Sequence, residues 1–155
     1  MASINIRQKG ANAERDIADD LNAIINEVRS AMGLPTLPKP AVQRNQNQSA
    51  VGGKDLVGTF DLAIEVKRQE QLSINTWWAQ CVKSATELNE IPVLLFKQSR
   101  QKWRCIMPVA LELPSSPAAV YSSLSTRAEI DYETFKLYFR ERVGRALYNS
   151  IAKEV

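Results

Sequence analysis

The sequence contains no histidine and only two cysteines, which excludes several common kinds of active site. Without imidazole there is no Ser-His-Asp triad, no histidine general base and no zinc site of the usual histidine-containing type. Cys81 and Cys105 each lie in an apolar stretch and are too few for a spaced zinc site, which predicts buried free thiols in a reducing compartment. Any hydrolytic chemistry must therefore use carboxylates, lysine and a hard metal ion.

Long hydrophobic runs and a dominant charge are also missing. No run approaches the roughly 18 apolar residues that cross a bilayer, and the N-terminus lacks the apolar core of a signal peptide, so we expect a cytoplasmic protein. Twenty Lys and Arg against seventeen Asp and Glu give a formal net charge of +3, which permits a polyanionic partner without demanding one. The 155 residues, 45% of them hydrophobic, predict one globular domain spanning residues 1–155.

Hydrophobic periodicity predicts helices near both ends of the chain and strands between them. Apolar residues recur at helical spacing from Gly10 to Met32, Asn75 is the expected N-cap of a second helix, and Asp131 that of a terminal amphipathic helix. Residues 108–128 show little periodicity and stay unassigned. Three segments have the apolar character of strands: 62–67, 92–96 and 102–107. This order predicts an α/β fold, a central mixed β-sheet flanked by helices.

A long loop and a tight turn precede the strands. Residues 34–54 hold three prolines, two glycines and a polar run, which predicts a loop of a length that is often functional. A short strand after Asp55 and the strand from Leu62 are expected to be joined by a turn at Gly58 to Asp61. On the second helix, adjacent Trp77 and Trp78 point about 100° apart. We therefore expect only one to be centrally buried and the other to stack on a base or lie at a dimer interface.

Three carboxylates stand where an unpartnered charge is costly. Glu14 falls on or beside the buried face of the first helix, Asp55 begins a strand after a Gly-Gly pair, and Glu65 interrupts an apolar strand. Glu65 and Lys67 lie two positions apart, so their side chains share one face of the strand. Alone, such a pair is most often an exposed ion pair; together with the other carboxylates it indicates a site for a cation such as Mg²⁺. Lys67 could then orient a water, or take its proton, for attack on a phosphate.

Asp55, followed ten positions later by Glu65-Val66-Lys67, resembles the PD-(D/E)xK superfamily of metal-dependent nucleases. The segment from Arg7 to Arg15, followed by a helix, is similar to the N-terminal helix of archaeal-type Holliday junction resolvases, and endonucleases of phages are more similar still. The resemblance covers about residues 7–107 and leaves about 108–155 as a C-terminal extension.

The motif aspartate has two candidates. Lys54 stands where a proline usually precedes it in the superfamily. Asp61 shares the alternation of Glu65 and Lys67, but it falls in the expected turn, where aspartate is common. We therefore favour Asp55 and keep Asp61 as the alternative.

The resemblance implies a restriction-endonuclease-like fold with Glu14, Asp55, Glu65 and Lys67 as catalytic residues. Asp55, Glu65 and the backbone carbonyl of Val66 would hold Mg²⁺ or Mn²⁺, and Glu14 would join them directly or through water. The function implied is a Mg-dependent DNA endonuclease, most specifically a Holliday junction resolvase acting on branched DNA in recombination. Cutting two symmetric strands predicts a homodimer, and a phage-encoded enzyme would act in the host cytoplasm.

Several cations and polar residues near these positions are expected to contact DNA phosphates. They are Arg7, Lys9, Arg15, Arg44, Ser49, Lys54, Arg68 and Gln80. Gln80 belongs to the set because similar nucleases often place a glutamine there, although an ordinary exposed glutamine explains it equally well. Two other functions stay open: a less structure-selective nuclease of DNA repair, recombination or degradation, and a DNA-binding protein that keeps a nuclease fold without cutting.

Overall fold

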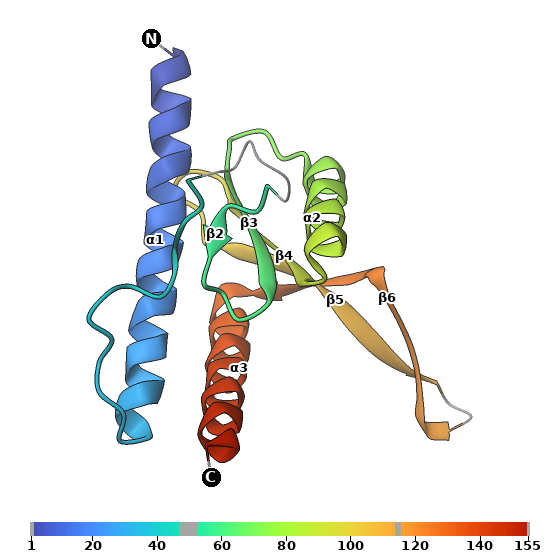
Figure 1. The fold of residues 1–155 in the computed structure, drawn as a ribbon. Helices are drawn as coiled ribbons and strands as arrows, with labels where there is room; N and C mark the ends of the chain where they lie inside the picture. Colours follow the sequence, from blue (N-terminus) through green and yellow to red (C-terminus); the bar gives the residue numbers. More distant parts are fainter. Residues whose placement is uncertain (1, 47–52, 114–115, 155) are drawn as a thin grey trace.

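The protein forms a mixed β-sheet with helices on both faces, which confirms the expected α/β class (Figure 1). The computed structural model describes residues 2–46, 53–113 and 116–154. The elements, in chain order, are α1 (Ala2–Ala31), β1 (Gln43–Arg44), β2 (Leu56–Val57), β3 (Leu62–Arg68), α2 (Ile74–Leu88), β4 (Ile91–Lys97), β5 (Arg104–Leu113), β6 (Ser116–Asp131) and α3 (Tyr132–Lys153). Within the described ranges, none of the helices combines the length and apolarity needed to cross a membrane.

The main sheet has the strand order β3-β4-β5-β6, so β3 forms one of its edges. β3 and β4 run parallel, with α2 as the crossover between them, whereas β5 and β6 are antiparallel to their neighbours. The short β1–β2 pair is a separate two-stranded sheet. The chain just before β2 lies along the outer edge of β3, where the Asp55 N–H donates to the Ile64 carbonyl at 3.1 Å.

The two faces of the sheet pack against different helices. Val66 of β3 belongs to the larger hydrophobic core, which includes residues of α1 and α3. On the other face, Leu94 and Phe96 of β4 pack against α2. The register pairs Glu65 with Leu94 and Lys67 with Phe96, and directly paired residues point to the same face. Glu65 and Lys67 therefore project on the α2 side of the sheet.

Helix α1 carries the predicted apolar stripe and begins eight residues earlier than the periodicity indicated. Its stripe is buried along most of its length: Ile17, Leu21, Ile24, Ile25 and Val28. Glu14, one turn before Ile17, is only 8% exposed, so the pattern placed this carboxylate correctly on the buried side.

Helix α3 begins where the sequence predicted. Asp131 is its N-cap, and its side chain accepts a hydrogen bond from the Thr134 N–H at 2.6 Å. This bond satisfies one of the free N–H groups in the first turn of the helix. Phe135, Phe139 and Val143 are buried on the face that meets α1 and the sheet.

The predicted start of α2 was wrong. The helix begins at Ile74, with Ser73 as its N-cap, and Asn75 lies inside the first turn. The Asn75 side-chain oxygen instead accepts a hydrogen bond from Arg127 Nη2 of β6 at 2.6 Å. This tertiary contact links two segments 52 positions apart, which local sequence patterns do not indicate.

The expectation that Trp77 and Trp78 could not both be buried was also wrong. They are 5% and 6% exposed and pack in one cluster with Cys81, and the Trp77 ring lies 6.1 Å from that of Phe96. An indole is long enough for two rings about 100° apart to reach apolar surface on both sides of the same helix turn. Neither ring is therefore exposed to stack on a base.

The unassigned residues 108–128 belong to a hairpin. β5 continues to Leu113 and β6 returns from Ser116, with register shifts between Pro108 and Ala110 and between Glu112 and Leu113. Figure 1 shows the outer part of this hairpin extending away from the helices. The two register shifts interrupt the regular two-residue alternation of this hairpin, which is consistent with the weak signal.

The turn before β3 falls where it was predicted, although β2 pairs with β1 and not with β3. Phe60 and Asp61 adopt positive φ angles of 55° and 65°, and the buried Thr59 hydroxyl donates to the Leu62 carbonyl at 2.5 Å. Gly58 has a φ of +76°, and a Cβ added there would lie 1.9 Å from the Ala41 carbonyl oxygen. The turn therefore requires glycine at this position.

We expect Gly58→Ala to lower the free energy of unfolding by about 2–4 kcal/mol, the combined cost of a strained left-handed residue and a backbone overlap. This corresponds to a fall in melting temperature of roughly 10 °C. Thermal unfolding followed by circular dichroism measures the change. Gly10→Ala is the matched control, because its Cβ meets nothing within 4 Å inside α1 and alanine favours a helix. Equal melting temperatures for the two variants would contradict the argument.

Candidate active site

Asp55 and Glu65 meet at the outer edge of β3. The Val66 N–H donates to Asp55 Oδ2 at 2.7 Å, which holds this carboxyl against the strand. Asp55 is 8% exposed and Glu65 is 6% exposed, and a hydrogen bond joins their carboxyl groups. The N–H and C=O of one strand residue point to the same side, so the Val66 carbonyl also faces this edge. Three oxygen donors are thus gathered in one place.

Burial is the largest influence on both carboxyls. It raises the pKa of Glu65 to about 8, with the charge of Asp55 as the next cause, and it also raises the pKa of Asp55. The Val66 N–H acts against the rise at Asp55, and Lys67 lowers the pKa of both groups while Glu14 raises it. The pair therefore resists carrying two negative charges, and a cation placed between the carboxyls would relieve this repulsion.

Glu14 reaches the same region from α1 but is held by a cation of the protein. Arg44 Nε donates to Glu14 Oε2 at 2.5 Å, and the Glu14 side chain is only 10% exposed. β1 supplies this arginine by pairing with β2 beside the site. Arg44 was predicted as a DNA contact; the structure engages it in the ion pair with Glu14.

The loop that carries Asp55 is fixed by hydrogen bonds from Asn45 and by an ion pair between Lys54 and Glu90. The Asn45 N–H donates to the Asp55 carbonyl at 2.8 Å, and Asn45 Nδ2 donates to the Lys54 carbonyl at 2.9 Å. Lys54 Nζ binds both carboxyl oxygens of Glu90, at 2.8 and 3.1 Å, with both side chains mostly buried. Lys54, predicted to contact DNA, therefore ties this loop to the start of β4. Nothing in the polar run around Asn45 distinguished it in the sequence.

The other predicted DNA contacts are dispersed. Three of them are exposed: Arg7, Arg15 and Gln80. Lys9 pairs with Glu70 of the segment after β3 at 2.7 Å. Arg68 ends β3, and its Nε is buried without a partner among the described residues. Ser49 lies outside the described residues.

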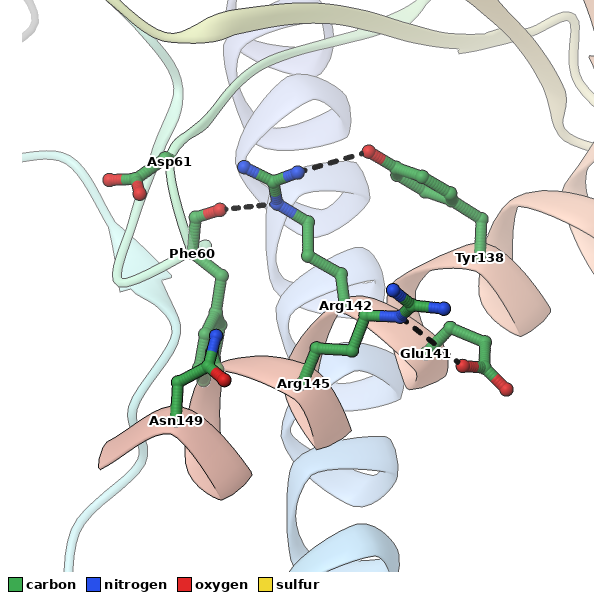
Figure 2. A pocket seen from close by; sticks show the side chains of 8 residues that line it. Phe60, Asp61, Tyr138, Glu141, Arg142, Arg145 and Asn149 are labelled. Atoms are coloured by element: carbon green, nitrogen blue, oxygen red, sulfur yellow. Dashed lines mark hydrogen bonds and ion pairs between the residues drawn. The ribbon is translucent and has the colours of Figure 1, made fainter. Parts of the chain in front are cut away.

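The alternative aspartate, Asp61, does not approach Glu65. It is exposed in the turn before β3, four residues from Glu65, which corresponds to about 13 Å along a strand. It lines a different pocket, and Figure 2 shows its carboxylate turned away from the other labelled side chains. The structure thus brings Asp55, and not Asp61, to Glu65.

This different pocket has a volume of about 570 Å³ and lies between the turn before β3 and α3 (Figure 2). Arg142 forms part of its wall, donating from Nε to the Phe60 carbonyl at 2.6 Å and from Nη1 to the Tyr138 hydroxyl at 3.2 Å. The charged lining residues are balanced in sign: Asp61 and Glu141, Arg142 and Arg145. These contacts tie α3 to the turn, and the pocket lacks an acidic pair like that at β3.

The oxygen atoms at the edge of β3 are of the kind that binds a hard divalent cation, but they are few. Across the described ranges, no group of three or more Asp, Glu or Cys side chains is arranged to hold a metal ion. The two buried carboxyls and the Val66 carbonyl provide three oxygens, and Mg²⁺ in proteins commonly keeps waters in its remaining positions. The residues present therefore fit Mg²⁺ or Mn²⁺ with an incomplete protein shell.

A family model with the description "Phage putative PDDEXK endonuclease" matches residues 5–150. The match continues beyond residue 107, through β6 and most of α3. A solved structure of Archaeoglobus fulgidus Hjc, a Holliday junction resolvase from an archaeal hyperthermophile, aligns with 21% identity and a TM-score of 0.42, covering 83% of this chain and 88% of that chain. No curated protein matched this chain.

Proposed function

The chain belongs to the family of phage PDDEXK endonucleases, and on that premise we propose that it is a metal-dependent endonuclease that hydrolyses DNA phosphodiesters in the host cytoplasm. The resemblance to the PD-(D/E)xK superfamily is thereby confirmed. The observation that carries the proposal is the buried Asp55–Glu65 pair at the edge of β3, next to Lys67.

Asp55, Glu65 and the Val66 carbonyl would hold the divalent cation, Mg²⁺ or Mn²⁺. When bound, this cation would supply Lewis-acid stabilisation of the negative charge that develops on the phosphoryl oxygens. Asp55 is prepared for this role because the Val66 N–H fixes one of its oxygens at 2.7 Å. Glu14 is held by Arg44 and contributes a negative charge near the pair, which strengthens attraction for a cation.

Lys67 would act on the attacking water. It shares a face of β3 with Glu65, and its charge lowers the pKa of both Asp55 and Glu65. An ammonium group in this place can orient the water and offset the negative charge of the five-coordinate transition state at phosphorus. The water oxygen forms the new bond to phosphorus and releases a proton to solvent, while the bond to the 3′ oxygen breaks and that oxygen takes a proton from solvent. The products are a 5′ phosphate and a 3′ hydroxyl.

We propose four-way junctions as the specific substrate and a two-fold homodimer as the active form. The support is the N-terminal segment resembling archaeal-type resolvases, in which the helix glutamate joins the site. Here Glu14 of α1 is buried, and its charge raises the pKa of both Asp55 and Glu65. Two symmetric cuts require two active sites, which a two-fold dimer provides.

A labelled synthetic four-way junction, incubated beside a linear duplex and a single strand of the same sequence, tests the proposal. We expect paired symmetric nicks in the junction with Mg²⁺ or Mn²⁺ and none in EDTA. Lys67→Ala should lower the cleavage rate by at least about 10²-fold while junction binding in EDTA is kept, because the lysine acts on the reaction more than on affinity.

Lys83→Ala is the matched control, because Lys83 is an exposed lysine of α2. It should cleave like the wild type. Cutting of all three substrates would replace the resolvase by a less selective nuclease. Binding without cutting under any metal condition would leave a DNA-binding protein with a nuclease fold.

A further inference from the structure

A basic pocket of about 400 Å³ lies at the turn between β4 and β5. Four of the residues that line it are cations: Lys97, Arg100, Lys102 and Arg104. None of the described residues that line it is acidic. The pocket beside α3, by contrast, has carboxylates and cations in equal number.

The basic pocket lies on the same face of the sheet as Lys67. The register pairs Lys67 with Phe96 and Phe96 with Arg104, so these three side chains form one row across β3, β4 and β5. Phe96 and Arg104 both line the pocket. Adjacent strands are about 4.8 Å apart, which puts Arg104 about 10 Å from Lys67. Phe96, the middle residue of the row, is fully buried against α2, so the row fixes the relative positions of the two sites and is not itself an open path.

Two of the four cations build the wall. Arg104 forms a two-point ion pair with Glu129 at 2.8 and 2.7 Å and lies over the Phe96 ring at 4.7 Å. Lys97 Nζ lies 5.4 Å from the centre of the Trp103 ring. These contacts hold both side chains in place, so they shape the pocket more than they offer free charge.

The other two cations are available to a ligand. Arg100 and Lys102 are exposed, and neither forms an ion pair with any residue that the structure describes. The charge of Lys102 acts on Asp131, whose pKa is lowered mainly by hydrogen bonds from Thr134 and to a smaller extent by this lysine. Exposed cations concentrated beside a recess attract an anion from solution.

The turn is held in place before any ligand arrives. Glu70, in the segment after β3, accepts a hydrogen bond from the Ser99 N–H at 3.2 Å, and its backbone carbonyl accepts one from Gln98 Nε2 at 2.8 Å. Lys9 of α1 binds the same Glu70 carboxylate at 2.7 Å. The segment leaving β3 thus fixes the turn, and binding there requires little ordering of the backbone.

We propose that the basic pocket binds a backbone phosphate of the DNA strand that is cut, within about two nucleotides of the scissile phosphate. Successive phosphates are displaced by about 3.4 Å along the helix axis and also rotate around it, so a separation of about 10 Å spans fewer than three nucleotides. Arg100 and Lys102 make the contact, beside the wall that Lys97 and Arg104 form. This inference rests on the proposed nuclease function and adds the direction in which the strand leaves the carboxyl site.

The test is DNA binding by the double variant Arg100→Gln/Lys102→Gln, measured in EDTA at several salt concentrations with a labelled linear duplex and a labelled four-way junction. Loss of one phosphate contact should weaken binding about tenfold at 0.1 M salt and reduce the slope of log K against log salt by about 1. Both substrates should lose the same factor, because a phosphate contact carries no sequence information. In Mg²⁺ the variant should show a higher KM with an unchanged kcat.

The matched control is Arg145→Gln/Lys153→Gln, which removes the same charge from exposed positions of α3, on the other side of the sheet. It should bind DNA like the wild type. Equal affinity and equal salt slope for the two double variants, with melting temperatures unchanged, would overturn the proposed pocket contact alone. A wild-type protein that neither binds nor cuts DNA would overturn the nuclease function itself.

Discussion

Glu65→Gln should abolish cleavage and at the same time make the metal-free protein more resistant to heat. The variant loses a cation ligand, so we expect the cleavage rate to fall at least about 10³-fold. The gain in stability has a separate cause. Burial and the neighbouring Asp55 raise the pKa of Glu65 to about 8 in the folded protein, whereas the unfolded chain ionises near 4.5.

The direction of the pH dependence follows from this difference. Between pH 4.5 and 8 the unfolded chain releases a proton that the folded protein keeps, so folding stability falls as the pH rises and the loss is complete above pH 8. Glutamine carries no proton to lose and can keep a hydrogen bond to Asp55. Each pKa unit removed is worth about 1.4 kcal/mol. A gain of one such unit, about 1.4 kcal/mol, raises the melting temperature at pH 8 by about 4 °C. The gain at pH 5 should be smaller.

Differential scanning calorimetry in EDTA between pH 5 and pH 8 measures this gain. Glu87→Gln is the control, because it makes the same substitution on the exposed side of α2 and should change the melting temperature little at any pH. Added Mg²⁺ or Mn²⁺ should raise the melting temperature of the wild type but not of Glu65→Gln, since only the wild type keeps both carboxylates for the ion. A loss of stability in EDTA would show that the Asp55–Glu65 repulsion does not destabilise the fold.

The parts of the molecule that sequence patterns anticipated are those set by local periodicity. The apolar stripe of α1 placed Glu14 on the buried side, and the capping aspartate located the start of α3. The resemblance to the PD-(D/E)xK superfamily selected Asp55 over Asp61 as the partner of Glu65, and the structure brings the two together because the loop before β2 runs beside β3.

The environment of the site could not be predicted in the same way. Arg44 and Lys54 look like free surface cations in the sequence, yet the structure gives each a carboxylate partner more than 25 positions away. Asn45, which fixes the Asp55 loop, sits in a polar run with no distinguishing pattern. The basic pocket depends on the β4–β5 turn lying beside the end of β3, an arrangement of the sheet and not of a motif.

The choice between the two candidate aspartates provides the most direct test of the site. Asp55→Asn should reduce cleavage at least about 10²-fold, because Asp55 is buried against Glu65 and accepts the Val66 N–H. Asp61→Asn should leave the rate within about twofold. Asp61 is exposed at the opposite end of β3, and asparagine tolerates its positive φ of 65°.

Both variants make the same change of one carboxylate to an amide, so their comparison isolates position from chemistry. Asp55→Asn should also bring the pKa of Glu65 down, because it removes the neighbouring charge that helps to raise it. The gain in melting temperature from Glu65→Gln should therefore shrink in an Asp55→Asn background and persist in an Asp61→Asn background. If Asp61→Asn were inactive and Asp55→Asn active, the cation would belong at the turn before β3, and the buried pair would be a structural feature of the sheet edge.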